Sequence, residues 1–288
     1  MTTTPSSAPL IAVSGASGRL GSKVAQRLSA RGVPQRLLVR DLARVPRLPG
    51  ATAAVAAYSD GGAARAALDG VHTLFMVSAF ESPTRVPEHR TFIDAAVAAG
   101  VRHLVYTSFY GAAEDAIFTY ARDHWQTEQH LRARGAAALQ WTFLRDNFYA
   151  DFLLELVGQD DVLRGPAGDG RVAAVAQDDI ADAAVAVLLD APAHAGRTYD
   201  LTGPQSLTLA EVARILSAAT GRAITYYAET LQEARASRAG ENTPDWLIDA
   251  WISTYTAICA GEVAAVTNDV PALTGHPATS LEELLRHR

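Results

Sequence analysis

The chain has 288 residues, enough for one large α/β domain or for a domain with a smaller appendage. Its hydrophobic fraction of 49% supplies a core, and no apolar run approaches the roughly 20 residues of a membrane-spanning helix. A net charge of −6 without a basic run argues against nucleic-acid binding. The single cysteine, Cys259, excludes an internal disulfide and a cysteine-cluster metal site. With no signal-peptide pattern at residues 1–10, we expect a cytoplasmic monomer or homodimer without a nucleic-acid or membrane partner.

The first element is a strand that leads through a glycine turn into a helix. Residues 10–13 are apolar and predict a buried strand, and residues 19–30 predict an amphipathic helix. Between them, Gly15, Gly18 and Gly21 recur at three-residue spacing. Glycine permits the tight turn and lets backbone N–H groups approach an anion at the positive end of a helix. The order of elements predicts a dinucleotide pyrophosphate site, with a ligand-free βα turn as the alternative.

Apolar runs and amphipathic stretches then alternate, which predicts an α/β fold with a doubly wound parallel Rossmann sheet. The expected strands are residues 10–14, 36–39, 51–56, 73–77, 103–107 and 141–144, and the expected helices are 19–30, 62–68, 87–99, 119–134 and 180–189.

The pattern becomes less regular after residue 144. We expect a short helix over 147–157, a glycine-bearing turn over 163–169, and a helix from the capping box of Thr208 and Glu211. Residues 224–288 should be helical, and their aromatic residues mainly core: Tyr226, Tyr227, Trp246, Trp251 and Tyr255. The expected divisions are a flexible segment (1–7), a dinucleotide-binding domain (8–190, with 147–170 contributing to the pocket) and a smaller, mostly helical substrate-capping region (191–288).

The end of the second strand selects the cofactor. Enzymes that use NAD usually place a carboxylate about 20 residues after the glycines, where it binds the ribose hydroxyls. This chain has Arg40 there, which suits the 2′-phosphate of NADPH or NADP⁺, and Arg19 could close on the same phosphate. If the strand runs one residue further, Asp41 becomes the ribose carboxylate and favours NADH. We expect NADPH.

Several motifs together resemble those of the NmrA-like, or atypical, short-chain dehydrogenase/reductases. They are GASGRLG (15–21), LVRD (38–41), AAYSD (56–60), VYTSFYGA (105–112), FLRDNFY (143–149), VAQDDIADAAVAVL (175–188) and GRTYDLTGP (196–204). Within the family, the chain looks most like the branch with NADPH-dependent quinone and triphenylmethane-dye reductases. The resemblance covers residues 9 to 215.

The resemblance implies a role for residues at the end of each strand. The pyrophosphate would be held by Gly15, Ser17, Gly18, Arg19 and Leu20, and the 2′-phosphate by Arg40. The adenine would lie near Tyr58 and Ser59, the ribose near Val77 and Ser78, and the nicotinamide near Thr107, Ser108 and Phe109. The nicotinamide and the substrate would be flanked by Asn147, Phe148 and Tyr149.

The wider superfamily uses a serine and a Tyr-x-x-x-Lys pair, in which the lysine lowers the pKa of the tyrosine. Here Ser108 is followed by Tyr120 and then by His124 at the lysine position. Lys23 is the only lysine and lies next to the glycine turn, so the lysine version is absent. His124 is either a pH-dependent substitute beside Tyr120 on one helix face, or an incidental polar residue. No histidine or carboxylate spacing predicts a metal site.

Without the Tyr–Lys pair, an unactivated ketone would lack proton assistance as charge develops on its oxygen. We therefore expect a quinone or another conjugated aromatic acceptor, with Phe80, Tyr110, Phe148 and Tyr149 as pocket candidates. Two other functions stay open: a redox-sensing regulator that binds NADP(H) without turnover, and a biosynthetic reductase of a ketone or imine.

Overall fold

The computed structural model describes residues 9–135, 139–240 and 243–286, so the expected flexible segment at 1–7 lies outside it. The chain divides into two compact units. Unit 1 comprises residues 1–107, 126–144 and 181–198, and unit 2 comprises 108–125, 145–180 and 199–288. The division expected near residue 190 differs from this one, because the chain passes between the units several times instead of finishing one before it begins the other.

A seven-stranded sheet in the order β3-β2-β1-β4-β5-β6-β9 confirms the doubly wound prediction. Its strands are β1 (Ile11–Val13), β2 (Gln35–Val39), β3 (Ala51–Val55), β4 (Thr73–Met76), β5 (His103–Phe109), β6 (Gln140–Asp146) and β9 (Arg197–Leu201). The pairs from β3 to β5 are parallel, and Val13 lies opposite both Leu37 and Phe75. Because the strands are parallel, the glycine turn and the ends of β2 and β4 share one edge of the sheet.

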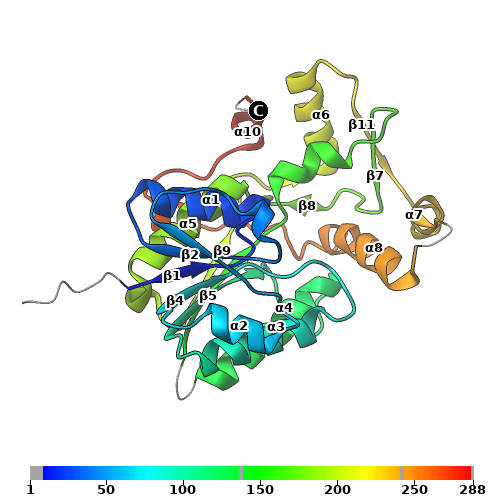
Figure 1. Cartoon of the computed structure of the whole chain (residues 1–288). Helices are drawn as coiled ribbons and strands as arrows, with labels where there is room; N and C mark the ends of the chain where they lie inside the picture. The colour runs from blue at the N-terminus through cyan, green and yellow to red at the C-terminus, as the bar shows by residue number, and fades with distance from the viewer. Residues whose placement is uncertain (1–8, 136–138, 241–242, 287–288) are drawn as a thin grey trace, which may run out of the picture. The chain divides into compact units, whose positions relative to one another are not determined.

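The expected helices of the Rossmann sequence form with shifts of at most three residues at their ends. They are α1 (Arg19–Ala30), α2 (Gly61–Ala67), α3 (Arg85–Ala98), α4 (Thr119–Gly135) and α5 (Gln177–Leu189), with 3₁₀ turns η1 (Leu42–Arg44) and η3 (Ala191–His194). In Figure 1, α1 lies on one side of β1 and β2, and α2 and α3 lie on the other. Helix α1 buries Leu20, Val24 and Leu28 because they recur on one helical face.

Unit 2 contains strands that the sequence did not predict. Segment β7 (Val162–Gly165) pairs in parallel with β11 (Thr225–Ala228), and β8 (Arg171–Val172) pairs antiparallel with β10 (Leu207–Thr208). The expected turn over 163–169 is therefore wrong for its first residues, and the expected all-helical stretch after 224 begins with a strand. The helix expected over 147–157 is a 3₁₀ helix, η2 (Ala150–Leu156).

The remaining helices of unit 2 are α6 (Leu209–Thr220), α7 (Leu231–Arg238), α8 (Asp245–Cys259), α9 (Asp269–Thr274) and α10 (Leu281–Arg286). The predicted capping box is confirmed, since the Thr208 hydroxyl accepts from the Glu211 N–H and the Glu211 carboxylate accepts from the Thr208 N–H. The expected aromatic core is confirmed for two of its five residues: Tyr255 is buried and Tyr226 is partly buried against the core. It is wrong for Tyr227 in β11 and for Trp246 and Trp251, which are 39 to 48% exposed; the face that α8 buries carries other residues than the two tryptophans.

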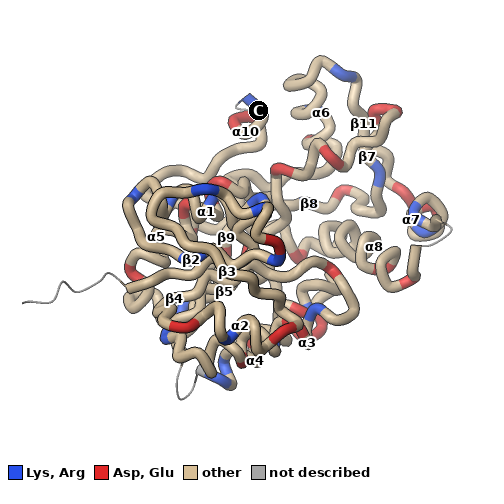
Figure 2. The backbone as a smooth tube through the Cα atoms, viewed as in Figure 1, with Lys and Arg blue, Asp and Glu red and all other residues tan. Residues whose placement is uncertain are grey.

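Lysine and arginine are interspersed with aspartate and glutamate along the described backbone of each unit (Figure 2). None of the described helices is both long and apolar enough to cross a membrane.

Candidate functional site

The glycine turn in unit 1 has the geometry of a phosphate cradle. Gly15 has a φ of +60°, and a Cβ there would lie 3.3 Å from the Cβ of Val77. Gly18 caps α1, whose first turn contains no acidic residue, and its N–H donates to the Gly15 carbonyl. The first N–H groups of a helix have no intrahelical acceptor, and the dipole makes that end positive. The turn therefore fits the pyrophosphate of a dinucleotide, and contact of Ser17, Arg19 and Leu20 with it stays a prediction.

Arg40 follows the last residue of β2 and is exposed, as a 2′-phosphate ligand must be. Asp41 caps η1, and its Oδ1 accepts from the Ala43 N–H at 2.9 Å. This local use of the carboxylate, together with the end of the strand at Val39, disfavours the alternative that Asp41 binds a ribose. The Arg40 guanidinium lies over the Phe80 ring at 5.6 Å, and Phe80 is 80% exposed. Phe80, predicted for the substrate pocket, thus stands beside the predicted phosphate ligand.

The segment from Val77 to Ala79, just after β4, is held by buried side chains. The Ser14 hydroxyl accepts from the Val77 N–H at 2.9 Å, and the Tyr58 hydroxyl donates to the Val77 carbonyl at 2.6 Å. The Thr107 hydroxyl accepts from the Ser78 N–H at 2.8 Å. These bonds fix the predicted ribose contacts, Val77 and Ser78, before any ligand binds.

Two residues of α3 complete this support. His89 Nε2 accepts from the Ala79 N–H at 2.8 Å, and Arg85 Nε donates to the Ala79 carbonyl at 3.0 Å. Burial and the positive charge of Arg85 lower the pKa of His89 well below its usual value. The imidazole is therefore neutral and keeps the lone pair that the Ala79 N–H requires.

Tyr58, predicted near the adenine, has a structural task. Its ring stacks on Phe92 at 4.1 Å, and its hydroxyl joins the Ser14 hydroxyl to the Val77 carbonyl. Burial raises the pKa of this phenol. Ser59 is exposed. The structure thus gives Tyr58 a role in positioning Val77, while adenine contact stays a prediction for both Tyr58 and Ser59.

The remaining predicted residues lie in unit 2 around a cluster of aromatic rings. Phe109, at the end of β5, lies 4.8 Å from Phe118, 4.9 Å from Phe148 and 6.1 Å from the imidazole of His124. Tyr120 is edge-on to Phe118 at 5.5 Å. The predicted catalytic pair of α4 therefore borders one aromatic cluster, and both side chains are buried.

Ser108 is buried in β5, one residue after Thr107, at the point where the chain passes from unit 1 to unit 2. Asn147 is buried and bonded at both ends of its amide: Nδ2 donates to the Val263 carbonyl at 3.0 Å, and Oδ1 accepts from the Phe148 N–H at 2.7 Å. Its amide positions the next residue, Phe148. Phe148 and Ala150 also exchange backbone hydrogen bonds with Val175.

Asp146, the last residue of β6, was not among the predicted site residues. It is 1% exposed, its Oδ2 accepts from the Tyr149 hydroxyl at 3.2 Å, and its Oδ1 is buried with no hydrogen-bond partner among the described residues. Burial raises the pKa of Asp146 well above its usual value and outweighs the bond from Tyr149. The Asp146 carbonyl also accepts from the N–H of Tyr110, a predicted pocket residue. Burial and the negative charge of Asp200 raise the pKa of the Tyr110 phenol.

Sequence reasoning also missed Ser14, Arg85 and His89. Ser14 precedes the glycine turn and could have been noticed as a polar residue ending an apolar strand. The two α3 residues give no such signal, because their contact with Ala79 depends on how the helix packs.

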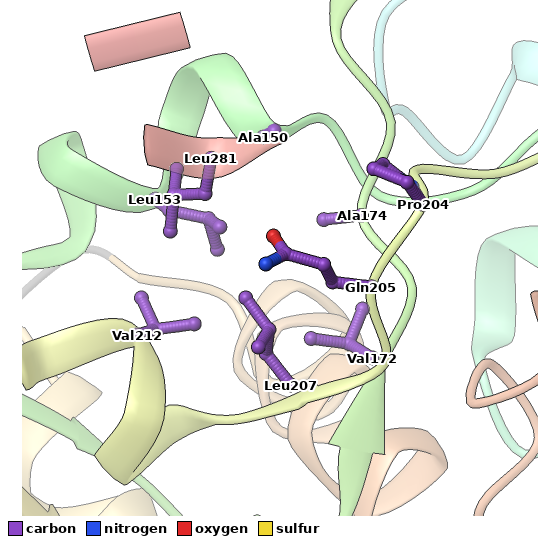
Figure 3. A pocket seen from close by; sticks show the side chains of 9 residues that line it. All are labelled: Ala150, Leu153, Val172, Ala174, Pro204, Gln205, Leu207, Val212 and Leu281. Atoms are coloured by element: carbon purple, nitrogen blue, oxygen red, sulfur yellow. The ribbon is translucent and has the colours of Figure 1, made fainter. Parts of the chain in front are cut away.

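A small cavity of about 10 Å³ lies in unit 2 between η2, β8 and α6. Figure 3 shows the amide of Gln205 pointing into it among apolar side chains, and the Gln205 Oε1 is buried with no partner among the described residues. This volume is about that of one water molecule, so the cavity cannot hold an aromatic acceptor. Among the described residues, no group of three or more His, Cys, Asp or Glu could hold a metal ion.

The profile of the NmrA-like family matches residues 7–237 of this chain. The chain belongs to the NmrA-like family. It is 34% identical to the NAD(P)H azoreductase of Xenophilus azovorans over 96% of this chain and 97% of that one. It is 32% identical to quinone oxidoreductase 2 of Escherichia coli over 96% and 98% of the two chains. The family resemblance inferred from the motifs is thereby confirmed.

Two solved structures resemble this NmrA-like chain over almost its whole length. The NADPH complex of the E. coli NADPH-dependent quinone oxidoreductase superposes with a TM-score of 0.86 at 32% identity, covering 96% of this chain and 99% of that one. The Citrobacter sp. triphenylmethane reductase complexed with NADP(H) gives 0.84 at 28% identity, with the same coverage.

Proposed function

We propose that this protein is an NADPH-dependent reductase of quinones or of other conjugated aromatic acceptors. The observation that carries the proposal is its likeness, over about 96% of its length, to reductases named for azo compounds, quinones and triphenylmethane dyes. The three named acceptor classes are chemically different but share an extended conjugated system that accepts two electrons readily. We infer the same class of acceptor here.

In this proposal, unit 1 holds the cofactor. The turn from Gly15 to Leu20 binds the pyrophosphate, and Arg40 binds the 2′-phosphate. Ser78, whose backbone N–H is held by the Thr107 hydroxyl, binds the ribose. Phe80 covers the same end of the site through its contact with Arg40. The bound nicotinamide supplies a hydride to the acceptor.

The acceptor binds, in this proposal, against Phe148, the partly buried ring of the cluster in unit 2, which packs on the buried rings of Phe109 and Phe118. Planar conjugated molecules gain stacking and burial energy against such rings. Tyr120 and His124 border the cluster and are proposed to orient the acceptor. Because His124 replaces the lysine of the superfamily, the site gives less proton assistance than a Tyr–Lys pair and favours acceptors that delocalise charge themselves.

The test is the loss of NADPH absorbance with the purified chain and a panel of quinones, azo compounds, cationic triphenylmethane dyes and unactivated ketones. We expect turnover with the conjugated acceptors and none with the ketones. Rapid reduction of simple ketones that is lost in Tyr120→Phe would contradict the acceptor assignment. Tight NADPH binding without turnover of any acceptor would instead identify a sensor.

Arg40→Ala tests the cofactor assignment. Removing a charge-assisted contact worth about 1.5 to 3 kcal/mol should weaken NADPH binding roughly 10- to 100-fold, and NADH binding should not change. Arg31→Ala is the matched control, because Arg31 is an exposed arginine at the opposite end of α1 that bonds only locally, to the Arg27 carbonyl, in the contacts described. Equal NADPH affinity in both variants would refute the role of Arg40.

A further inference from the structure

A buried carboxyl group and a tyrosine lie together at the end of β6. Asp146 is 1% exposed, and its Oδ2 lies 3.2 Å from the Tyr149 hydroxyl. Its Oδ1 has no hydrogen-bond partner among the described residues. Tyr149 is only partly buried, so its phenol is the more accessible member of the pair.

An ionised carboxylate in this position would be unstable. A buried charge without compensating bonds is strongly unfavourable, and such a carboxyl group normally remains protonated. The pKa of Asp146 is accordingly raised by burial. A neutral carboxyl group also carries an O–H that can donate a proton as an acid. A carboxylate or an asparagine at the same position has no such O–H.

The pair adjoins the proposed acceptor site along the chain and through contacts within unit 2. The Asp146 carbonyl accepts from the Tyr110 N–H at 2.9 Å, and Tyr110 directly follows Phe109 of the ring cluster. Between Asp146 and Tyr149 lies Phe148, the ring that packs on Phe109 and Phe118. Tyr149 is itself held on Val175 by a parallel backbone bridge.

We propose that Asp146 and Tyr149 form a proton relay to the reduced acceptor, in which Tyr149 donates to the acceptor and Asp146 replenishes Tyr149. This inference rests on the proposed reductase function. Tyr149 is the catalytic residue, and Asp146 acts through it as a positioning and proton-supplying residue. The relay supplies a proton to an acceptor that already delocalises the negative charge left by hydride addition, so the preference for conjugated acceptors is kept.

A quinone needs one proton in addition to the hydride. Hydride from the reduced nicotinamide adds two electrons and one proton, which leaves a hydroquinone monoanion. The Tyr149 O–H bond breaks as a new O–H bond forms on the acceptor oxygen, and the Asp146 carboxyl proton moves to the Tyr149 oxygen. Asp146 is left ionised and takes a proton from solvent before the next turnover.

A cationic triphenylmethane dye needs no such proton. Hydride addition to its central carbon cancels the positive charge and gives a neutral product directly. Quinone reduction requires both hydride transfer and proton delivery, whereas dye reduction requires hydride transfer alone. Comparing the two rates in one protein therefore isolates the effect of proton delivery. A variant that merely disturbs folding or the ring cluster would slow both reactions.

The experiment compares quinone and cationic-dye reduction by NADPH in the wild-type chain, Asp146→Asn and Tyr149→Phe. General acid catalysis contributes about 10²- to 10⁴-fold, so both variants should lower kcat for the quinone at least about tenfold more than kcat for the dye. Asp151→Asn is the control: it is also a buried carboxyl of unit 2, whose Oδ2 accepts from the Gln177 N–H, and its quinone-to-dye ratio should not change.

A second readout does not depend on turnover. Infrared difference spectra at pH 7, without cofactor, should show the carbonyl stretch of a protonated carboxyl group that is lost in Asp146→Asn and kept in Asp151→Asn. Absence of that band, or an unchanged quinone-to-dye ratio in the active variants, would overturn the relay alone. A wild-type chain that reduces neither acceptor would overturn the proposed function together with the relay.

Discussion

Replacing Gly21 with alanine adds one methyl group and should lower both the stability of the chain and its affinity for NADPH. It lies in the first turn of α1, and a Cβ there would be 2.3 Å from the Gly15 carbonyl oxygen and 2.7 Å from its carbonyl carbon. It would also lie 2.9 Å from the Ser14 carbonyl oxygen. All three are backbone atoms, which cannot rotate away as a flexible side chain could. In Gly21→Ala, the start of α1 must therefore move away from the glycine turn at Ser14 and Gly15.

The size of that movement follows from the contact distance. Ordinary contact begins near 3.4 Å, so the closest pair must separate by about 1 Å. Overpacking of this kind lowers the free energy of unfolding by about 1 to 3 kcal/mol. A shift of about 1 Å at the phosphate turn should also weaken NADPH binding by roughly 10- to 100-fold, because the aligned N–H groups would lose their geometry.

Gly62→Ala is the matched control. Gly62 lies inside α2, and a Cβ there would meet only the Asp60 side chain, at 3.5 Å. The same exchange should raise the free energy of unfolding by up to about 1 kcal/mol, because alanine loses less conformational entropy in a helix. Urea unfolding and fluorescence titration with NADPH measure both effects. If Gly21→Ala keeps the parent stability and affinity, the close-packing argument is wrong.

Two further predictions concern buried charge. Arg238 lies 2.7 Å from the nearly inaccessible Glu229 carboxylate, so Arg238→Ala should lower the free energy of unfolding by about 3 to 5 kcal/mol. Arg164→Ala, which breaks an exposed pair with Asp160, should lower it far less in the same urea titration. Burial and the nearby His194 and His72 lower the pKa of His103 from 6.5 to about 4. As the pH drops, the imidazole of His103 is therefore protonated in the unfolded chain before it is protonated in the folded one. The free energy of unfolding should fall between pH 6.5 and 4, by at most about 3 kcal/mol. In His103→Gln, whose amide can still donate to Thr142, this slope should flatten; an unchanged slope between pH 7 and 4.5 would exclude His103 as its source.

The parts of the fold that sequence predicted well are those with local signals. The Gly15 turn is encoded by spacing within seven residues, and the capping box of α6 by two residues three positions apart. Strands β7 and β11 were missed because each has four residues, and the pairing of Leu163 with Tyr226 depends on a partner more than 60 positions away. Neither segment shows alternation that would have distinguished it from a loop.

For the site, sequence identified residue types and strand ends but not their surroundings. The position of Arg40 just after β2 could be predicted from where the apolar run ends, and its role as a 2′-phosphate ligand stays a prediction. The structural role of Tyr58 could not be predicted, since it arises from contacts with Ser14 and Val77, which directly follow β1 and β4. The same holds for His89, whose neutral imidazole is needed only because the Ala79 N–H points at it.

Asp146 shows why burial decides chemistry that sequence leaves open. The residue stands within a motif that was recognised, yet an aspartate at a strand end is ordinarily an exposed, ionised group. Here the fold removes it from water, leaves Oδ1 without a hydrogen-bond partner in the part of the chain that the structure describes, and places Oδ2 beside Tyr149. A chain without a second lysine has no Tyr–Lys pair to deliver a proton, and a buried neutral carboxyl group is one of the few acids that a protein can offer at neutral pH. The acceptor preference and the proton source are therefore linked: if the relay operates, acceptors that become anions on hydride addition should depend on Asp146, and those that become neutral should not.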